Sequence, residues 1–249
     1  MTLAYDGAAF AGWQVQPQKR TIQGMLEAAL KQVTGMQQRI TASGRTDAGV
    51  HALGQVAGFA CDTSLEPAGL RRALNANTPE AIFILDLEEI EEGFHAIRDA
   101  LRKRYRYVMS DGPEMDVFSR AYCWHQWKRL DVERMDQAAR RLLGRHDFVA
   151  FQATGADRLT TERTIFDIGV KREPYMQSGA GQGSKILFEV EADGFLYNMV
   201  RNIVGTLMDI GHGRKPVDWI SEVLAAGDRK LAGQTAPAYG LFLVKVEYS

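Results

Sequence analysis

The stretch from Ser43 to His51 contains the residue types of this chain best suited to chemistry. It places a base, Arg45, and an acid, Asp47, two residues apart, with the hydroxyl of Thr46 between them and a glycine on either side. Glycines let a backbone turn tightly and leave room for a ligand close to the chain. A carboxylate held there could act as a nucleophile or a base. The same spacing suits a plain tight turn in which Asp47 accepts hydrogen bonds from neighbouring NH groups, and spacing alone favours the turn.

The flanking sequence predicts strands over Ile40–Ser43 and Gln55–Ala60, so this loop should join two strands. Loops held by a rigid scaffold are common sites of function. The first half should also contain a strand at Leu3–Tyr5, a helix over Ile22–Val33 capped by Thr21, a helix from Pro67 to Ala76, and a strand through Ile82 and Ile84. The predicted order is β-α-β-β-α-β.

The second half is predicted to repeat that order. Its expected elements are a strand through Tyr105, Tyr107 and Met109, a helix capped by Asp131 and stopping at Gly144, strands at Thr164–Val170 and Ile186–Val190 joined by a turn with Gly179, Gly181 and Gly183, a helix over Phe195–Ile210, a shorter helix from Pro216, and a last strand at Leu241–Val246. The sequence therefore predicts an α+β fold of two ferredoxin-like halves, each an antiparallel sheet with helices on one face. We expect domains at 1–95 and 96–249, with the boundary between Glu91 and Arg102.

Composition excludes several classes of protein. The 249 residues are 45% hydrophobic and 24% charged, which is unlike a disordered or fibrous chain. No apolar run approaches the roughly 18–20 residues that span a bilayer, and Met1–Gly7 lacks the pattern of a signal peptide. Cys61 and Cys123 are far apart, and no two histidines have the spacing HxxxH. We therefore expect no disulfide scaffold, no metal site and a cytoplasmic location.

The distribution of charge is more informative than its sum. Lys and Arg total 30 against 31 acidic residues, so the chain is not uniformly basic. The segment Asp86–Glu92 is strongly acidic, however, and Arg98–Arg106 is strongly basic. A neutral total can therefore hide a local positive face of the kind that phosphate binding needs. On charge alone, solvated strand and helix faces are the favoured explanation of both segments.

Gly44-Arg45-Thr46-Asp47-Ala48-Gly49-Val50-His51, followed by Gly54-Gln55-Val56, resembles the signature of the TruA family of tRNA pseudouridine synthases. Shorter segments resemble the family in the same order along nearly the whole chain. They are Tyr5-Asp6-Gly7, Phe10-Ala11-Gly12-Trp13-Gln14, Asn75-Ala76-Asn77, Phe94-His95-Ala96, Arg104-Tyr105-Arg106-Tyr107, Met199-Val200-Arg201-Asn202-Ile203-Val204-Gly205 and Gly240-Leu241-Phe242-Leu243-Val244. Two departures are Ile97, where many members carry arginine, and Phe242, where tyrosine is common.

The resemblance implies an isomerase without a cofactor that converts uridine to pseudouridine in the anticodon stem-loop of tRNA, at positions 38, 39 and 40. It also implies a catalytic cleft between the two halves and a homodimer. The reaction breaks the N1–C1′ bond, turns the base and joins C5 to C1′. A carboxylate can serve either as the nucleophile at C1′ or as the base that removes the C2′ proton, and the sequence leaves both routes open.

The resemblance also assigns roles to single residues. Asp47 is the catalytic aspartate and Arg201 its ion-pair partner, since a nearby guanidinium favours the ionised carboxylate. Tyr105 stacks on the target base and assists removal of the C5 proton, and Arg45 helps to displace the target nucleotide from its stem. Leu243 forms an apolar wall near the base. Weaker contacts to the RNA backbone are expected from Arg102, Lys103 and Arg104.

Two other classes of function fit parts of the sequence. A non-catalytic RNA-binding protein could use the same sheets and basic segments, but it would not need Asp47. A glycosidase breaks a similar bond at C1′, but it needs two carboxylates at a defined separation, and no second acid stands out.

Overall fold

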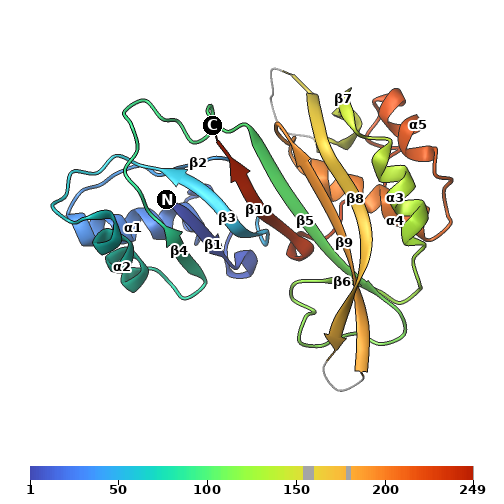
Figure 1. Cartoon of the computed structure of the whole chain (residues 1–249), viewed down its shortest axis with the longest axis horizontal. Helices are drawn as coiled ribbons and strands as arrows, with labels where there is room; N and C mark the ends of the chain where they lie inside the picture. The colour runs from blue at the N-terminus through green and yellow to red at the C-terminus, as the bar shows by residue number, and fades with distance from the viewer. Residues whose placement is uncertain (154–159, 178–180, 249) are drawn as a thin grey trace. The chain divides into compact units, whose positions relative to one another are not determined.

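The computed structural model describes residues 1–153, 160–177 and 181–248, with only the backbone described at 175–177 and 181–183. The chain forms two compact units, which are Met1–Leu101 with Phe242–Ser249, and Arg102–Leu241 (Figure 1). This division differs from the predicted domains at 1–95 and 96–249. The junction lies between Leu101 and Arg102, at the end of the window in which it was expected, and the last strand belongs to the first unit.

The first unit has the predicted order of elements. They are β1 (Thr2–Tyr5), η1 (Gly7–Ala9), α1 (Ile22–Thr34), β2 (Thr41–Ala42), β3 (His51–Gly58), α2 (Pro67–Asn77) and β4 (Ile82–Asp86). Thr21 caps α1 by accepting a hydrogen bond from the NH group of Gly24, and Pro67 stands at the start of α2, as predicted. The strands are ordered β4-β1-β3, with β2 also paired to β3. The apolar faces of α1 and α2 and of the strands form the core, with Leu3, Leu26, Leu30, Leu74 and Ile84 fully buried.

Strand β10 (Leu241–Glu247) completes the first unit's sheet by pairing in parallel with β3, where Phe242 lies opposite His51 and Leu243 opposite Ala52. The prediction of a purely antiparallel sheet is therefore wrong for this pair, and the assignment of β10 to the second half is also wrong. Alternating apolar residues define the two faces of a strand, but they do not identify its partner. A Cβ on Gly54 would lie 2.5 Å from the carbonyl oxygen of Val244, so glycine permits this close pairing.

The second unit is built on an antiparallel sheet ordered β5-β9-β8-β7. Its strands are β5 (Arg102–Asp111), β7 (Gly144–Asp147), β8 (Glu162–Gln177) and β9 (Gly181–Ala192), and β6 (Trp124–Gln126) pairs in parallel with β5. Helices α3 (Val132–Arg140), α4 (Met199–Gly211) and α5 (Trp219–Ala226) lie on one side of this sheet (Figure 1), with short helices η2 (Val149–Phe151) and η3 (Ala238–Gly240). The α+β fold is confirmed in both units.

Several predicted boundaries shift for local reasons. Helix α4 begins at Met199 and not at Phe195, because Asn198 has φ +59°, a left-handed conformation that no α-helix continues through. Helix α3 ends at Arg140, and Gly144, with φ +94°, begins β7. Strands β8 and β9 extend through the predicted turn as far as Gln177 and Gly181. The expected turn residue Gly179 lies outside the described residues.

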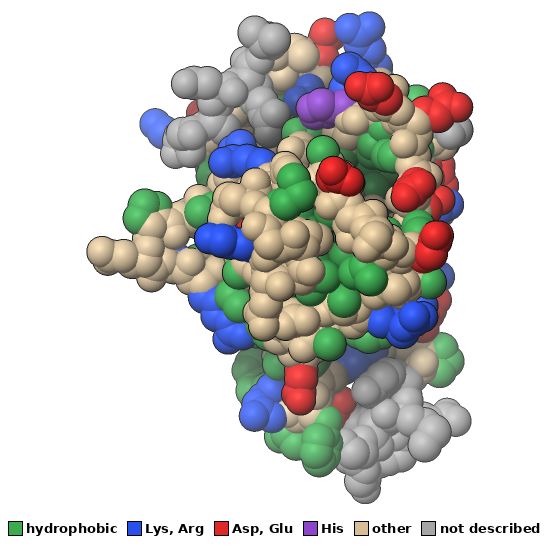
Figure 2. Space-filling view, turned by 90° about the vertical axis from the view of Figure 1, so that its left-hand side faces the viewer, with side chains coloured by type: hydrophobic (Ala, Val, Ile, Leu, Met, Phe, Trp, Pro, Cys, Tyr) green, Lys and Arg blue, Asp and Glu red, His purple; other side chains and the backbone are tan. Residues whose placement is uncertain are grey.

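The surface carries both acidic and basic side chains, and Lys and Arg lie at several places around the face shown in Figure 2. Figure 2 shows one face of the molecule, on which most of the acidic side chains gather at the upper right of the view. In the part of the chain that the structure describes, no helix is both long enough and apolar enough to cross a membrane.

Candidate active site

The predicted reactive loop lies in the first unit between β2 and β3. Arg45 is exposed, Asp47 is half-buried and Thr46 is buried. The side chain of Thr46 therefore faces the interior, between the candidate functional residues Arg45 and Asp47. Asp47 thus retains access to solvent while its neighbour fixes the loop to the core.

The backbone of this loop is tied down on both sides of Asp47. The NH group of Trp13 donates to the carbonyl oxygen of Thr46 at 2.9 Å, and the NH group of Val50 donates to that of Asp47 at 3.1 Å. Gly12 lies directly against the loop, since a Cβ there would stand 2.7 Å from the Thr46 oxygen and its φ is +91°. Any other residue at Gly12 would be strained and would displace the loop.

A cluster of buried polar side chains lies beneath the loop. Gln55 donates through Nε2 to the carbonyl oxygen of Gly44 at 2.8 Å, and its Oε1 accepts from Ser43 Oγ at 2.8 Å. The Tyr5 hydroxyl lies 2.7 Å from Thr46 Oγ1 and 3.3 Å from Gln55 Nε2. Burial raises the pKa of Tyr5 to about 12, partly opposed by the hydrogen bonds to Thr46 and Gln55. The Tyr5 hydroxyl therefore stays protonated at neutral pH.

The far end of the loop is fixed at His51, the first residue of β3. His51 Nδ1 accepts a hydrogen bond from the NH group of Gly7 at 3.1 Å and lies 3.0 Å from Asp6 Oδ1. The imidazole stacks on Phe242 with 4.8 Å between ring centroids. Both ends of the loop are therefore held by buried or half-buried neighbours.

Leu243 lies on β10 next to this end of the loop, opposite Ala52 of β3. Its side chain is 0% exposed. In this structure Leu243 is a core residue of the first unit, which is compatible with a supporting wall.

Tyr105 lies on β5 of the second unit, opposite Val190 of β9. Its ring is 8% exposed and meets Phe195 edge-on, with 5.0 Å between centroids and an interplanar angle of 82°. The structure thus gives Tyr105 a defined ring orientation on a rigid strand.

Arg201 lies in the first turn of α4 and is half-buried. Its Nε donates to the carbonyl oxygen of Ala236 at 2.7 Å, and Nη1 donates to Asn198 Oδ1 at 2.8 Å. Asn198, whose left-handed conformation sets the start of α4, directs its amide oxygen to this guanidinium. The fold therefore fixes the orientation of Arg201 through hydrogen bonds to Ala236 and Asn198.

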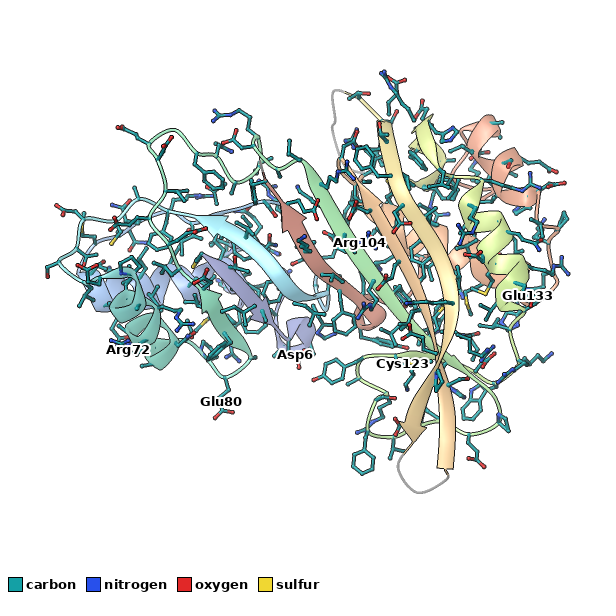
Figure 3. The ribbon with its side chains drawn as sticks, in the orientation of Figure 1. Asp6, Arg72, Glu80, Arg104, Cys123 and Glu133 are labelled. Carbon is teal, nitrogen blue, oxygen red and sulfur yellow. The ribbon has the colours of Figure 1, made fainter. Side chains whose placement is uncertain are left out.

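The arginines of β5 lie in a network of ion pairs. Arg102 Nη1 lies 3.2 Å from Glu191 Oε1, while Arg104, labelled in Figure 3, lies 3.0 Å from both Asp167 and Glu191. Burial alone would lower the pKa of Arg104, but the hydrogen bonds and charges of Glu191 and Asp167 outweigh it and raise that pKa. The sequence predicted RNA contacts for Arg102, Lys103 and Arg104 and did not identify these carboxylate partners.

Sequence reasoning also missed the supporting roles of Tyr5, Gln55 and Asn198. Tyr5 and Gln55 both belong to segments that resemble the family. They lie 50 positions apart in the chain, however, and no sequence pattern indicates that they meet. Asn198 directly precedes the resembling segment that contains Arg201. No group of three or more histidine, cysteine, aspartate or glutamate side chains suited to a metal ion occurs among the described residues.

Comparison with known proteins identifies the family. A family model described as tRNA pseudouridine synthase matches residues 1–99 and 138–249. The tRNA pseudouridine synthase A of Geobacillus sp. (strain WCH70) is 46% identical over 248 residues, covering 99% of this chain and 96% of that protein. That of Halalkalibacterium halodurans is 44% identical over 242 residues, covering 97% and 89% of the two chains. A tRNA pseudouridine synthase A 2 of Clostridium perfringens is 44% identical over 248 residues, covering 100% and 98%.

The matches to the relatives cover most of this chain and of each relative, and the match to the family model includes the loop that contains Asp47. The resemblance drawn from short motifs is thereby confirmed, and the chain belongs to the tRNA pseudouridine synthase family, whose members are isomerases.

Proposed function

We propose that this chain converts uridine to pseudouridine at positions 38, 39 and 40 of the tRNA anticodon stem-loop, with Asp47 as its catalytic carboxylate. The observation that carries the proposal is the immobilised loop, in which the backbone on both sides of a half-buried Asp47 is hydrogen-bonded. A preorganised carboxylate suits a reaction in which C1′ changes its bond from N1 to C5. The proton displaced from C5 leaves to solvent or to a basic side chain, and N1, released from C1′, takes up a proton in exchange.

Arg45 supports the same reaction from its exposed position on the loop. A uridine inside a helical stem can be reached only after it is flipped out, and a guanidinium beside the catalytic carboxylate can hold the displaced phosphate. Tyr105, Arg201 and Leu243 keep the roles that the family resemblance gives them.

The decisive experiment measures tritium release from unmodified tRNA transcribed with C5-tritiated uridine. Asp47→Asn should abolish release while the Kd for tRNA stays within about twofold of the wild type, because one carboxylate adds little to phosphate binding. Wild-type turnover by this variant would overturn the role of Asp47.

The same assay separates the other two functions. A non-catalytic RNA-binding protein would bind tRNA without releasing tritium. A glycosidase would release free uracil, which nucleoside analysis of the tRNA and of the supernatant would detect.

We also propose that two copies of the chain associate through the segment between β5 and β6. Its large apolar side chains are exposed, at 40% for Met115, 50% for Val117, 76% for Phe118 and 39% for Tyr122. The segment is nevertheless anchored, because Asp116 accepts from the NH group of Phe118 at 3.1 Å and its carboxylate lies 3.8 Å from Lys185 Nζ. Anchored and exposed apolar groups of this number are typical of an interface between proteins.

Sedimentation of the wild type and of a Val117→Ser, Phe118→Ser double variant tests this interface. The wild type should sediment as a dimer and the variant as a monomer. If the wild type sediments as a monomer, the proposal of a dimer is wrong. If the double variant still sediments as a dimer, the interface lies on another surface. Neither result affects the assignment of Asp47.

A further inference from the structure

We propose that Tyr5, acting with Gln55 and Thr46, is a positioning residue that fixes the orientation of the Asp47 loop for catalysis. The inference rests on the proposed function and adds to it a group of residues that does not touch the substrate. All the contacts that carry it lie within the first unit.

The hydrogen bonds of this cluster fix the orientation of the Gln55 amide. The carbonyl oxygen of Gly44 can only accept, so the Gln55 atom at 2.8 Å from it must be the amide nitrogen. The second hydrogen of that nitrogen points to the Tyr5 oxygen at 3.3 Å. Thr46 Oγ1 lies 2.7 Å from the same Tyr5 oxygen, and either hydroxyl can supply the hydrogen of that bond. The remaining amide atom, Gln55 Oε1, accepts from Ser43 Oγ, which completes the amide's bonding.

Water cannot replace any member of this chain of bonds. Tyr5 is 4% exposed, Thr46 6% and Gln55 0%. Removing the Tyr5 hydroxyl would leave a hydrogen of Gln55 and the hydroxyl of Thr46 each with one partner fewer in the interior, where unmet polar groups are costly. The side chain of Thr46 would then be free to take another rotamer.

Thr46 transmits this constraint to the site because it stands between Arg45 and Asp47. Its side chain is held from below by Tyr5, while its carbonyl oxygen is held by the NH group of Trp13 at 2.9 Å. Two anchors on one residue fix the direction in which the next residue leaves the loop. A displacement of the reacting group by about 1 Å can cost roughly a hundredfold in rate, so these anchors act on kcat.

The test compares Tyr5→Phe and Thr46→Val with the conservative Thr46→Ser in steady-state tritium release from tRNA. Both variants that lose a hydroxyl should lower kcat roughly tenfold to a hundredfold with the Kd for tRNA unchanged within about twofold. Thr46→Ser keeps the oxygen and should restore most of the rate. In the Tyr5→Phe, Thr46→Val double variant, the loss should equal that of one single variant, because both changes break the same bond.

Asn75→Ala is the matched control. Asn75 makes two hydrogen bonds in the same unit, from Nδ2 to the carbonyl oxygen of Ile84 at 3.0 Å and from the NH group of Ile84 to Oδ1 at 2.8 Å. This variant should lose comparable thermal stability and keep the wild-type kcat. A Tyr5→Phe enzyme with the kcat of the control, or additive losses in the double variant, would overturn the inference. Absence of tritium release from the wild type would overturn the proposed function instead.

If Tyr5→Phe does not fold, the comparison of Thr46→Val with Thr46→Ser decides the question alone. Equal kcat in those two variants would overturn the positioning role, because the hydroxyl at position 46 is then without effect on the rate.

Discussion

Arg104 and Glu191 lie opposite each other on β5 and β9, with 3.0 Å between Nη2 and the carboxylate oxygen Oε2. The Arg104 side chain is 28% exposed and that of Glu191 only 10%. Glu191 also forms an ion pair with Arg102, and Arg104 also forms one with Asp167. The pair is therefore part of a network of ion pairs on this sheet. An arginine in such a network already has partners, and binding to a phosphate would require those ion pairs to open.

Arg104→Ala should therefore act mainly on stability. Removing the guanidinium leaves a largely buried Glu191 with one partner fewer, which should lower the free energy of unfolding by about 1–2 kcal/mol. Urea denaturation measures this change. The control is Arg145→Ala, whose pair with Glu162 is exposed at 70% and 52% and should contribute almost nothing. A Kd for tRNA that weakens tenfold or more without a stability change would instead show that Arg104 contacts RNA.

Arg201 should not be replaceable by another cation. Its fork donates to two acceptors, Ala236 and Asn198, and a lysine ammonium cannot reproduce both bonds in that geometry. We expect kcat to fall by roughly a hundredfold in Arg201→Ala and about tenfold in Arg201→Lys, with the fold retained by circular dichroism. Normal turnover by Arg201→Ala would mean that catalysis does not need this charge.

Substitutions of Tyr105 distinguish a packing role of this residue from a catalytic one. Tyr105→Phe keeps the edge-on contact with Phe195, so it should fold and bind tRNA, but it should stall before release of the C5 proton. Tyr105→Ala should in addition lose about 3–5 kcal/mol of stability and a stacking contribution of roughly 1–3 kcal/mol per base. Rapid-quench analysis of the tRNA measures the stalled species. Unchanged turnover in Tyr105→Phe would show that the hydroxyl has no part in catalysis and that Tyr105 has only a packing role.

The free energy of unfolding should fall in alkali because of two tyrosines, of which Tyr5 is buried and Tyr248 half-buried. Burial raises the pKa of both Tyr5 and Tyr248 from an ordinary value of 10.0 to about 12. Between these values the unfolded chain releases the phenol protons and the folded chain keeps them, so the unfolded state gains stability as pH rises through this range. The stabilisation is complete below pH 10 and lost towards pH 12.

Urea melts across that range test the effect. Tyr5→Phe should make the slope of the free energy of unfolding against pH shallower by up to about 1.4 kcal/mol per pH unit. An identical slope in wild type and variant would show that the Tyr5 phenol ionises as readily in the fold as in water.

The sequence by itself determined the local structure and the position of the reactive loop. Thr21 before an apolar periodic run and Pro67 at the next helix start are short-range signals, and both mark helix starts in the structure. The loop with Arg45 and Asp47 joins two paired strands because glycines and polar residues interrupt two apolar runs. These features depend on neighbours within a few residues, which the sequence displays directly.

The tertiary structure decided which distant segments meet. Strand β10 pairs with β3 of the first unit, although its alternation suits either sheet equally. The arginines of β5 became ion-paired because β9 presents Glu189 and Glu191 in register with them. Tyr5 and Gln55 meet Thr46 only because β1 and β3 are neighbours in the folded sheet. A strand's partner, an ion pair and a buried hydrogen-bond chain all depend on the three-dimensional path of the backbone, so no local pattern specifies them.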